Sequence, residues 1–268
     1  MYNTISKVPL FFEEIIEWNK PEKENVSRYS NIFKPNQSIH LFILVHGYKG
    51  SSFDLRLVRN NLMILFPDAL FVLSDSNEND TENDLAMMGL NLANEIKEYI
   101  SSNITKNSLK CINFIGHSLG GLIIRAALPH LEDYKDKFNT LLTFSTPHLG
   151  LMFSESAITS TGFWIMQQWK NALSLSQLSL KETKDRKSSF LYKMSDFPSF
   201  EWFQNIILIG SGQDSYCHYE SGRIEICKEV LNSKERGPYY IEMLKKLKSK
   251  LVNKNVILLD INFKINKT

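Results

Sequence analysis

One serine stands in a spacing that suits a nucleophile. An apolar run over residues 111–115 precedes it and a helical pattern over residues 119–128 follows it, which is the strand–turn–helix context of a nucleophile elbow. So sharp a turn strains the serine backbone, and the glycines two residues before and two residues after Ser118 let the chain pass. The turn lifts the hydroxyl to a helix N-terminus, whose dipole favours developing negative charge. The alternative is a glycine-rich turn around an inert serine. The motif reads Gly116-His117-Ser118-Leu119-Gly120-Gly121.

A second glycine motif predicts an oxyanion hole. Val45-His46-Gly47-Tyr48 closes an earlier apolar run. Backbone N–H groups at such a place can stabilise the charge that develops on an ester oxygen. We expect the N–H groups of Tyr48 and Leu119 to be the two donors. His46 itself we interpret as a packed, hydrogen-bonded side chain, because an oxyanion loop uses its backbone.

An acidic residue follows a later apolar run, in Leu208-Ile209-Gly210-Ser211-Gly212-Gln213-Asp214. Its position after the nucleophile fits the order Ser, Asp/Glu, His of α/β-hydrolases. In that role Asp214 would orient an imidazole and stabilise the imidazolium. An aspartate that only caps the following turn is the alternative.

The elements that must position these residues alternate between strands and helices. Continuous apolar runs are typical of strands in a parallel sheet that is buried on both faces. Ser51 with Asp54, and Thr81 with Asp84, form two predicted capping boxes ahead of amphipathic helices. This alternation predicts an α/β fold of the α/β-hydrolase type, with a mostly parallel, doubly wound sheet. The predicted strands are 41–45, 69–73, 112–115, 141–144, 206–209 and 256–259.

Two segments interrupt that alternation. Residues 1–38 precede the first strand, and we expect them to be an extension that packs on a domain of residues 39–268. Residues 151–200 form an insertion longer than most connections between elements. Its apolar side chains indicate a lid, with Trp164 and Met166 binding substrate, although they could simply pack on the sheet. The large ones are Phe163, Trp164, Met166 and Trp169.

Composition excludes several classes of protein. The 31 basic and 29 acidic residues nearly balance, which argues against nucleic acid as a partner. Three cysteines show no metal-ligand spacing. The start does not resemble a signal peptide, and no apolar stretch is long enough to span a bilayer. We therefore expect a cytoplasmic protein without a transmembrane segment, which leaves room for peripheral membrane contact.

With these motifs in place, the chain resembles the eukaryotic putative serine esterase family of lipase-like α/β-hydrolase domains. It is most similar to the branch with this domain at the C-terminus of larger proteins. The resemblance runs from about residue 40 to residue 263 and implies a hydrolase of acyl esters or lipid-like substrates, involved in lipid metabolism and without a cofactor. The stretches that carry it are 54–58, 79–81, Thr146-Pro147-His148-Leu149-Gly150, 164–170, 190–192 and 223–228.

The chain departs from the family at the triad histidine, which should follow the last strand. No histidine lies between residue 256 and Thr268. We expect His117 to face away from the serine and His148 to have a supporting role. His218 lies on the loop of the acid, where it would rarely have both reach and an orienting partner. Two hypotheses remain: an esterase with the C-terminal end of its fold, including the histidine, missing from this chain, and an inactive pseudo-hydrolase that serves as a binding or scaffold module. A weaker third is an acyltransferase.

Overall fold

A single parallel sheet forms the centre of the molecule. The structure, a computed structural model, describes residues 38–105, 107–153 and 172–262, and Ser38–Thr268 clusters as one compact unit. The sheet has the order β2-β1-β3-β4-β5-β6, and each neighbouring pair is parallel. All six predicted strands are confirmed. Their bounds are β1 Ile39–Val45, β2 Leu70–Leu73, β3 Leu109–His117, β4 Phe138–Phe144, β5 Asn205–Gly210 and β6 Asn255–Asp260.

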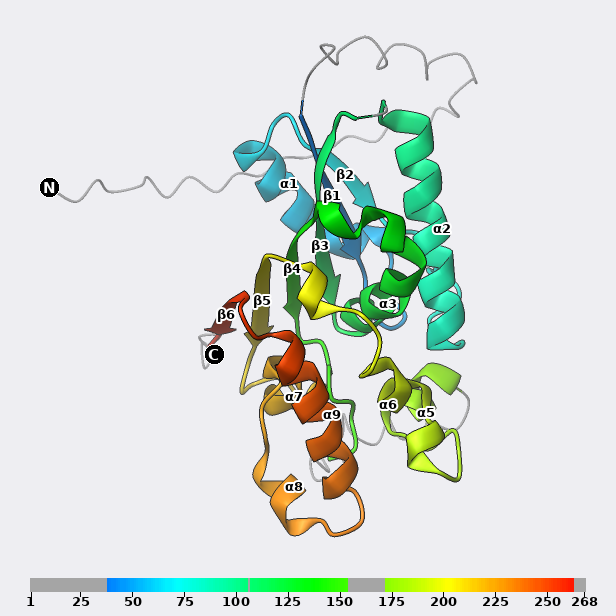
Figure 1. Ribbon diagram of the computed structural model, residues 1–268, viewed down its shortest axis with the longest axis vertical. Coiled ribbons are helices and arrows are strands. Elements are labelled where there is room, and N and C mark those ends of the chain that lie inside the picture. Colours follow the sequence, from blue (N-terminus) through cyan, green and yellow to red (C-terminus); the bar gives the residue numbers. More distant parts are fainter. Residues whose placement is uncertain (1–37, 106, 154–171, 263–268) are drawn as a thin grey trace, which may run out of the picture. The chain divides into compact units, whose positions relative to one another are not determined.

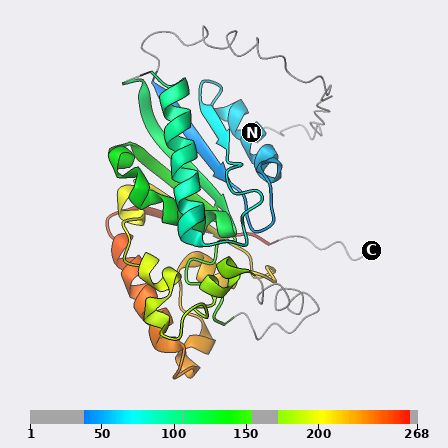
Figure 2. The ribbon, with the colours of Figure 1, turned by 90° about the vertical axis from the view of Figure 1, so that its right-hand side faces the viewer.

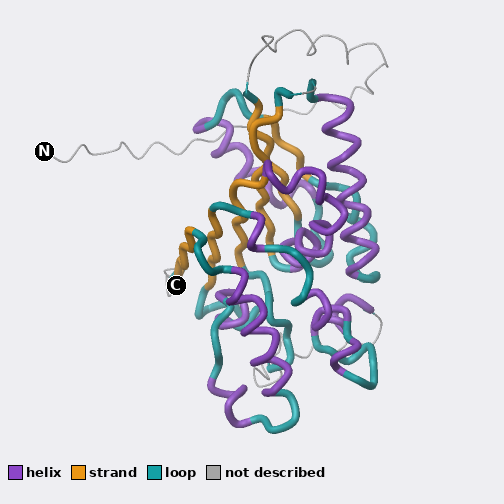
Figure 3. The backbone as a smooth tube through the Cα atoms, in the orientation of Figure 1, coloured by secondary structure: helices purple, strands orange, loops and turns teal. Residues whose placement is uncertain are grey.

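Helices connect the strands and lie on both sides of the sheet. In Figure 1, α1 and α2 lie on opposite sides, and α5 to α8 gather beyond the arrowheads of the strands. Figure 3 shows the same arrangement, with loops linking the helices at that end. The α-helices are α1 Arg56–Leu65, α2 Leu85–Asn103, α3 Leu119–Ala127, α5 Leu173–Leu178, α6 Phe190–Met194, α7 Tyr219–Arg223, α8 Lys228–Asn232 and α9 Gly237–Lys250. The 3-10 segments are η2 Ser52–Leu55, η3 Leu128–Lys137, η5 Arg186–Ser188 and η6 Phe200–Trp202.

The two faces of the sheet are covered unequally. The larger core includes the inner faces of α2, α3 and α9, whereas a small cluster around Phe42, Leu44, Leu55 and Ile115 lies under η2 and α1. In Figure 2 the long helix α2 crosses in front of the sheet. The prediction that every strand is buried on both faces is correct for most of β1 and wrong for β6, in which no residue is fully buried. In β5, buried and half-buried residues alternate.

One of the two predicted capping boxes is confirmed. The backbone N–H of Ser51 donates to the Asp54 carboxylate at 3.0 Å, and the reciprocal bond is present at the start of η2. The second is wrong. Asp84 is itself the N-cap of α2 and accepts from the N–H of Ala86 at 2.9 Å, while Thr81 accepts from the N–H of Lys49. Thr81 is buried, so its hydroxyl serves a long-range contact instead of the helix start.

The predicted extension over residues 1–38 lies, apart from Ser38, outside the described residues. So do residues 154–171 of the insertion. The division of the chain at residue 38 therefore stays a prediction.

Candidate active site

Ser118 occupies the sharp turn between β3 and α3. Its backbone has φ 51° and ψ −121°, a left-handed region that residues with a side chain rarely adopt. Its N–H donates to the carbonyl of Phe144 at 3.0 Å, which ties the turn to the end of β4. The strained turn expected from the sequence is therefore present.

The glycines around the turn allow backbones to approach closely. A Cβ atom on Gly120 would lie 2.2 Å from the carbonyl oxygen of Val45, and one on Gly116 would lie 2.6 Å from the Cα of Gly121. Real Cβ atoms do not come so near. Both positions require glycine because α3 packs directly against β3 and the end of β1.

The serine opens into a cavity of about 320 Å³, a volume in the range of small-molecule sites. Loops that follow β1, β3, β4 and β5 contribute to its wall, so it lies at the carboxyl end of the sheet. Leu151, Leu175 and Leu178 give one part of the wall an apolar character. The lining residues are Gly47, Tyr48, Gly50, Asp54, His117, Ser118, Leu119, Ser145, Pro147, Leu151, Leu175, Leu178, Asp214, Tyr216 and Cys217.

Both predicted oxyanion-hole residues line this cavity. Leu119 is the first residue of α3, where the backbone N–H has no partner within the helix. Tyr48 lies on the loop after β1, and its hydroxyl donates to the Glu82 carboxylate at 2.9 Å. Because that bond engages the hydroxyl with Glu82, which precedes α2, the backbone of Tyr48 remains for the proposed role.

Asp214 also lines the cavity. Its Oδ1 accepts from the backbone N–H groups of Tyr216 at 2.8 Å and Cys217 at 3.0 Å. The carboxylate therefore caps its own turn while it faces the space that Ser118 also faces. The sequence left two interpretations of Asp214, an acid that orients an imidazole and a cap of the following turn. One carboxylate in this position is compatible with both.

The position of His117 differs from the expectation. It lines the cavity and stacks on Phe144, with ring centroids 4.9 Å apart. Burial lowers the pKa of His117, and the negative charges of Asp54 and Asp214 oppose that shift.

The other histidines do not line the cavity. His46 is buried, and its Nδ1 lies 2.9 Å from the carbonyl oxygen of Gly47. His148 is buried too, with Nε2 2.9 Å from the Thr143 hydroxyl. Burial, and then the charge of Arg125, hold the pKa of His148 well below its usual value.

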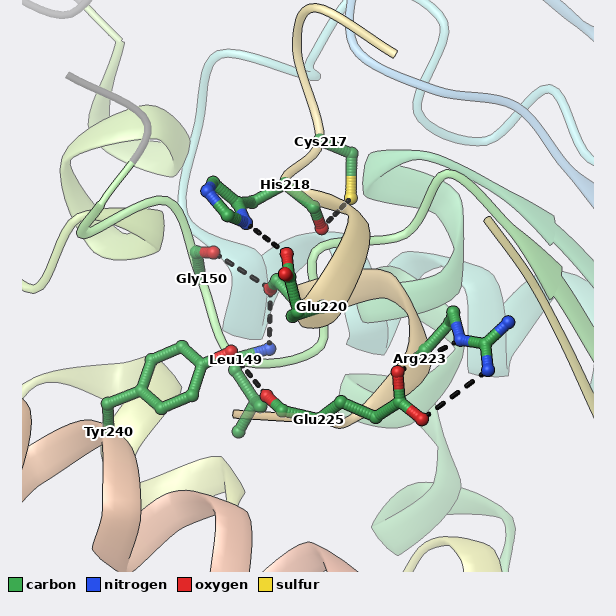
Figure 4. A network of polar contacts seen from close by, with 9 residues as sticks. Leu149, Gly150, Cys217, His218, Glu220, Arg223, Glu225 and Tyr240 are labelled. Carbon is green, nitrogen blue, oxygen red and sulfur yellow. Dashed lines mark hydrogen bonds and ion pairs between the residues drawn. The ribbon is translucent and has the colours of Figure 1, made fainter. Parts of the chain in front are cut away.

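His218 has the orienting partner that the sequence did not suggest. Its Nδ1 lies 2.7 Å from the carboxylate of Glu220 (Figure 4). Close by, the Ser221 hydroxyl accepts from the N–H of Leu149 at 3.1 Å and donates to the carbonyl of Gly150 at 2.9 Å. These bonds connect the loop after β4 to α7, and thereby to the loop that carries Asp214.

The predicted lid covers residues 151–200, of which the structure describes residues 151–153 and 172–200. Trp164 and Met166 lie outside the described residues. From the described parts of the insertion, Leu151, Leu175 and Leu178 line the cavity, and the sequence analysis did not single them out. The spacing of the last two within α5 was the available signal, because residues three apart share a helix face.

Within the described ranges, no group of His, Cys, Asp and Glu side chains could hold a metal ion. The described helices also include none that is both long and apolar enough to cross a membrane.

Two curated proteins of Saccharomyces cerevisiae are similar to this chain. "Putative lipase ROG1" is 28% identical over 152 residues, which is 52% of this chain and 20% of that protein. "Putative lipase YDL109C" is 29% identical over 132 residues, 44% of this chain and 20% of that protein. Each match thus spans about a fifth of the relative's length.

Two solved structures match this chain at low sequence identity. The lipase BlEst2 of Bacillus licheniformis in its mature form is 17% identical with a TM-score of 0.48, and the match covers 85% of this chain and 84% of that one. The peroxisomal alpha-beta-hydrolase Lpx1 of Saccharomyces cerevisiae is 12% identical with a TM-score of 0.46, over 86% and 73%.

A family model matches residues 35–229. That range includes the elbow, the loop after β1 and Asp214. It also includes the Thr-Pro-His-Leu-Gly loop. The chain therefore belongs to the family described as "Putative serine esterase (DUF676)".

Proposed function

We propose that this chain is a serine esterase or lipase that hydrolyses acyl esters through Ser118. The observation that carries the proposal is the strained serine at a helix N-terminus, open to a cavity with an apolar wall. The Ser118 oxygen attacks the acyl carbon, the alcohol leaves, and water then hydrolyses the acyl-enzyme. The N–H groups of Tyr48 and Leu119 would stabilise the oxyanion.

The acid of the proposed triad is Asp214. It shares the cavity wall with Ser118 and has two backbone donors that fix its carboxylate. A rigid carboxylate suits the task of orienting an imidazolium.

The substrate class follows from the wall of the cavity. Leu151, Leu175 and Leu178 offer apolar surface to an acyl chain, which supports a lipid-like ester and a role in lipid metabolism. Trp164 and Met166, on the proposed lid, would add to that surface. A cytoplasmic location with peripheral membrane contact is part of the same proposal.

A labelling experiment tests the nucleophile. A fluorophosphonate probe should form one covalent adduct, and Ser118→Ala should abolish it. We expect labelling to be slow, because His117 is the cavity-lining histidine and lies next to the serine in sequence, a poor place for a general base. Mass spectrometry of the adduct locates it; an adduct that persists in Ser118→Ala removes Ser118 from the mechanism.

Free imidazole tests the base. If Ser118 and Asp214 are poised but lack a histidine, added imidazole should enter the cavity and accelerate labelling, since general-base assistance is typically worth about 10²–10⁴-fold. Asp214→Asn should reduce that acceleration. A wild-type rate that imidazole leaves unchanged, and that falls in His117→Gln or His218→Gln, would show instead that the chain has its own base.

The second candidate is a catalytically inactive binding or scaffold module. It is favoured by the position of His218 and its partner Glu220, neither of which lines the cavity although the neighbouring Cys217 does. A module of this kind would bind a long-chain phosphonate as tightly in Ser118→Ala as in the wild type, with no labelling under any condition.

A further inference from the structure

The segment η2–α1 exposes an unusual amount of apolar surface. Six of the ten residues of α1 are apolar, yet none of the ten is fully buried. Among the large apolar side chains of this segment, four are at least 60% exposed: Phe53 60%, Leu57 67%, Ile64 65% and Leu65 70%.

Three of these side chains belong to α1, and Phe53 belongs to η2 just before it. Val58 and Leu62 are the residues of α1 that pack on the small cluster over β1. Leu57 and Ile64 are seven residues apart and therefore lie on one face. Leu65 is seven residues from Val58, but at the last position of α1 it is 70% exposed. The helix thus has an apolar stripe toward the sheet and a second apolar stripe toward solvent. A helix that is apolar on both sides needs a second apolar phase to cover it.

The charged residues of α1 indicate which kind of partner covers the outer apolar stripe. The helix contains Arg56 and Arg59 and no acidic residue, and Arg56 is exposed beside Leu57. An apolar stripe next to basic side chains is typical of helices that lie in the interface of an anionic membrane.

The segment also lies at the rim of the cavity. Gly50 and Asp54 line the cavity, and Phe53 lies between them in sequence. Polar contacts hold this rim in place: the Ser51–Asp54 capping box and a 2.6 Å bond from the N–H of Ser52 to Glu78. The apolar stripe is thus fixed before any partner arrives.

We propose that η2–α1 is the surface by which this protein contacts an anionic lipid bilayer. Phe53, Leu57, Ile64 and Leu65 enter the acyl region, and Arg56 lies among the phosphate groups. The choice of a lipid partner rests in part on the proposed function, since this surface adjoins the cavity of a proposed lipase, but the contact itself does not require Ser118.

Sedimentation with vesicles tests this proposal. The full chain is mixed with phosphatidylcholine vesicles that contain or lack phosphatidylserine. We expect binding to the anionic vesicles, and a decrease of at least about tenfold in partitioning for Leu57→Gln/Ile64→Gln, because two large apolar side chains no longer insert. Arg56→Gln should weaken binding to anionic vesicles and leave binding to neutral ones unchanged. The matched control is Leu231→Gln, which changes a leucine 69% exposed on α8 and should bind as the wild type does.

The outcomes separate this inference from the proposed enzyme. Ser118→Ala should bind vesicles normally, whatever its effect on labelling. Equal binding by wild type and Leu57→Gln/Ile64→Gln, or no binding by the wild type, overturns the inference. A concentration-dependent dimer that Leu57→Gln/Ile64→Gln abolishes, without vesicle binding, would assign the stripe to a protein contact instead. The single variant Leu65→Gln decides the same question if the double variant fails to fold.

Discussion

At the scale of single residues, the site depends on a serine in an unfavourable conformation. A positive φ at a residue with a side chain costs about 1–3 kcal/mol, and Ser118 has φ 51°. The neighbouring glycines make the turn possible, because their missing side chains let α3 lie on the end of β1. Because the effect of these glycines is steric, replacing one of them should change the free energy of unfolding even without substrate.

Gly120→Ala should destabilise the fold. Its Cβ would lie 2.2 Å from a backbone carbonyl oxygen, which cannot move without shifting β1, and overpacking of this kind typically costs about 1–3 kcal/mol. Gly212→Ala is the control, since no atom lies within 4 Å of its Cβ. Denaturant unfolding measures both, and a Gly120→Ala variant as stable as Gly212→Ala would contradict the close approach.

At the scale of elements, the loop after β4 connects the elbow to the acid. Its backbone is held from one side by Ser221 of α7 and from the other by Arg125 of α3, whose Nη1 donates to the carbonyl of His148 at 3.0 Å. Arg125 is fully buried, and so is the ring of His148. A fixed loop keeps Ser145 and Pro147 in the cavity wall.

The burial of His148 predicts a pH dependence of stability. The unfolded chain takes up a proton on this histidine near pH 6.5, whereas in the folded protein its pKa is well below that value. The unfolded state therefore binds more protons below pH 6.5, and the free energy of unfolding should fall as the pH decreases, by up to about 1.4 kcal/mol per unit.

Denaturant unfolding at pH 7.5 and at pH values below 6.5 measures this slope. His148→Gln should be less stable than the wild type at pH 7.5 but lose less on acidification. His130→Gln, at an exposed position, controls for the loss of a histidine. If the free energy of unfolding falls by the same amount with pH in the wild type and in His148→Gln, this histidine is not the source of the pH dependence.

At the scale of the whole molecule, packing decreases across the sheet. Residues of β1 and β3 are mostly buried, whereas Ile257 and Leu259 of β6 are 40% and 44% exposed. β6 still pairs with β5, and just after it the N–H of Ile261 donates to the carbonyl of Gly210 at 2.9 Å. Backbone bonds with few buried apolar contacts open at low free energy.

Hydrogen exchange should therefore show a gradient of protection. We expect the amides of β6 to exchange through local opening, faster than those of β5, while β1 and β3 exchange only with global unfolding. Mass spectrometry of peptides from each strand measures this order. Equal protection of β6 and β3 would show that the outer strand is held by something other than the contacts described above.

The sequence by itself determined the local features of this protein. The elbow at Ser118, the capping box at Ser51 and the six strands depend on residues close together in the chain, so spacing and residue type were enough to predict them. The tertiary structure decided what the cavity contains. His117 lines it, His148 is buried away from it, and Leu175 and Leu178 reach it from a distant segment. It also decided that β6 is exposed. Such features depend on which elements pack together across the fold, and a side chain's own neighbours in sequence carry little information about that.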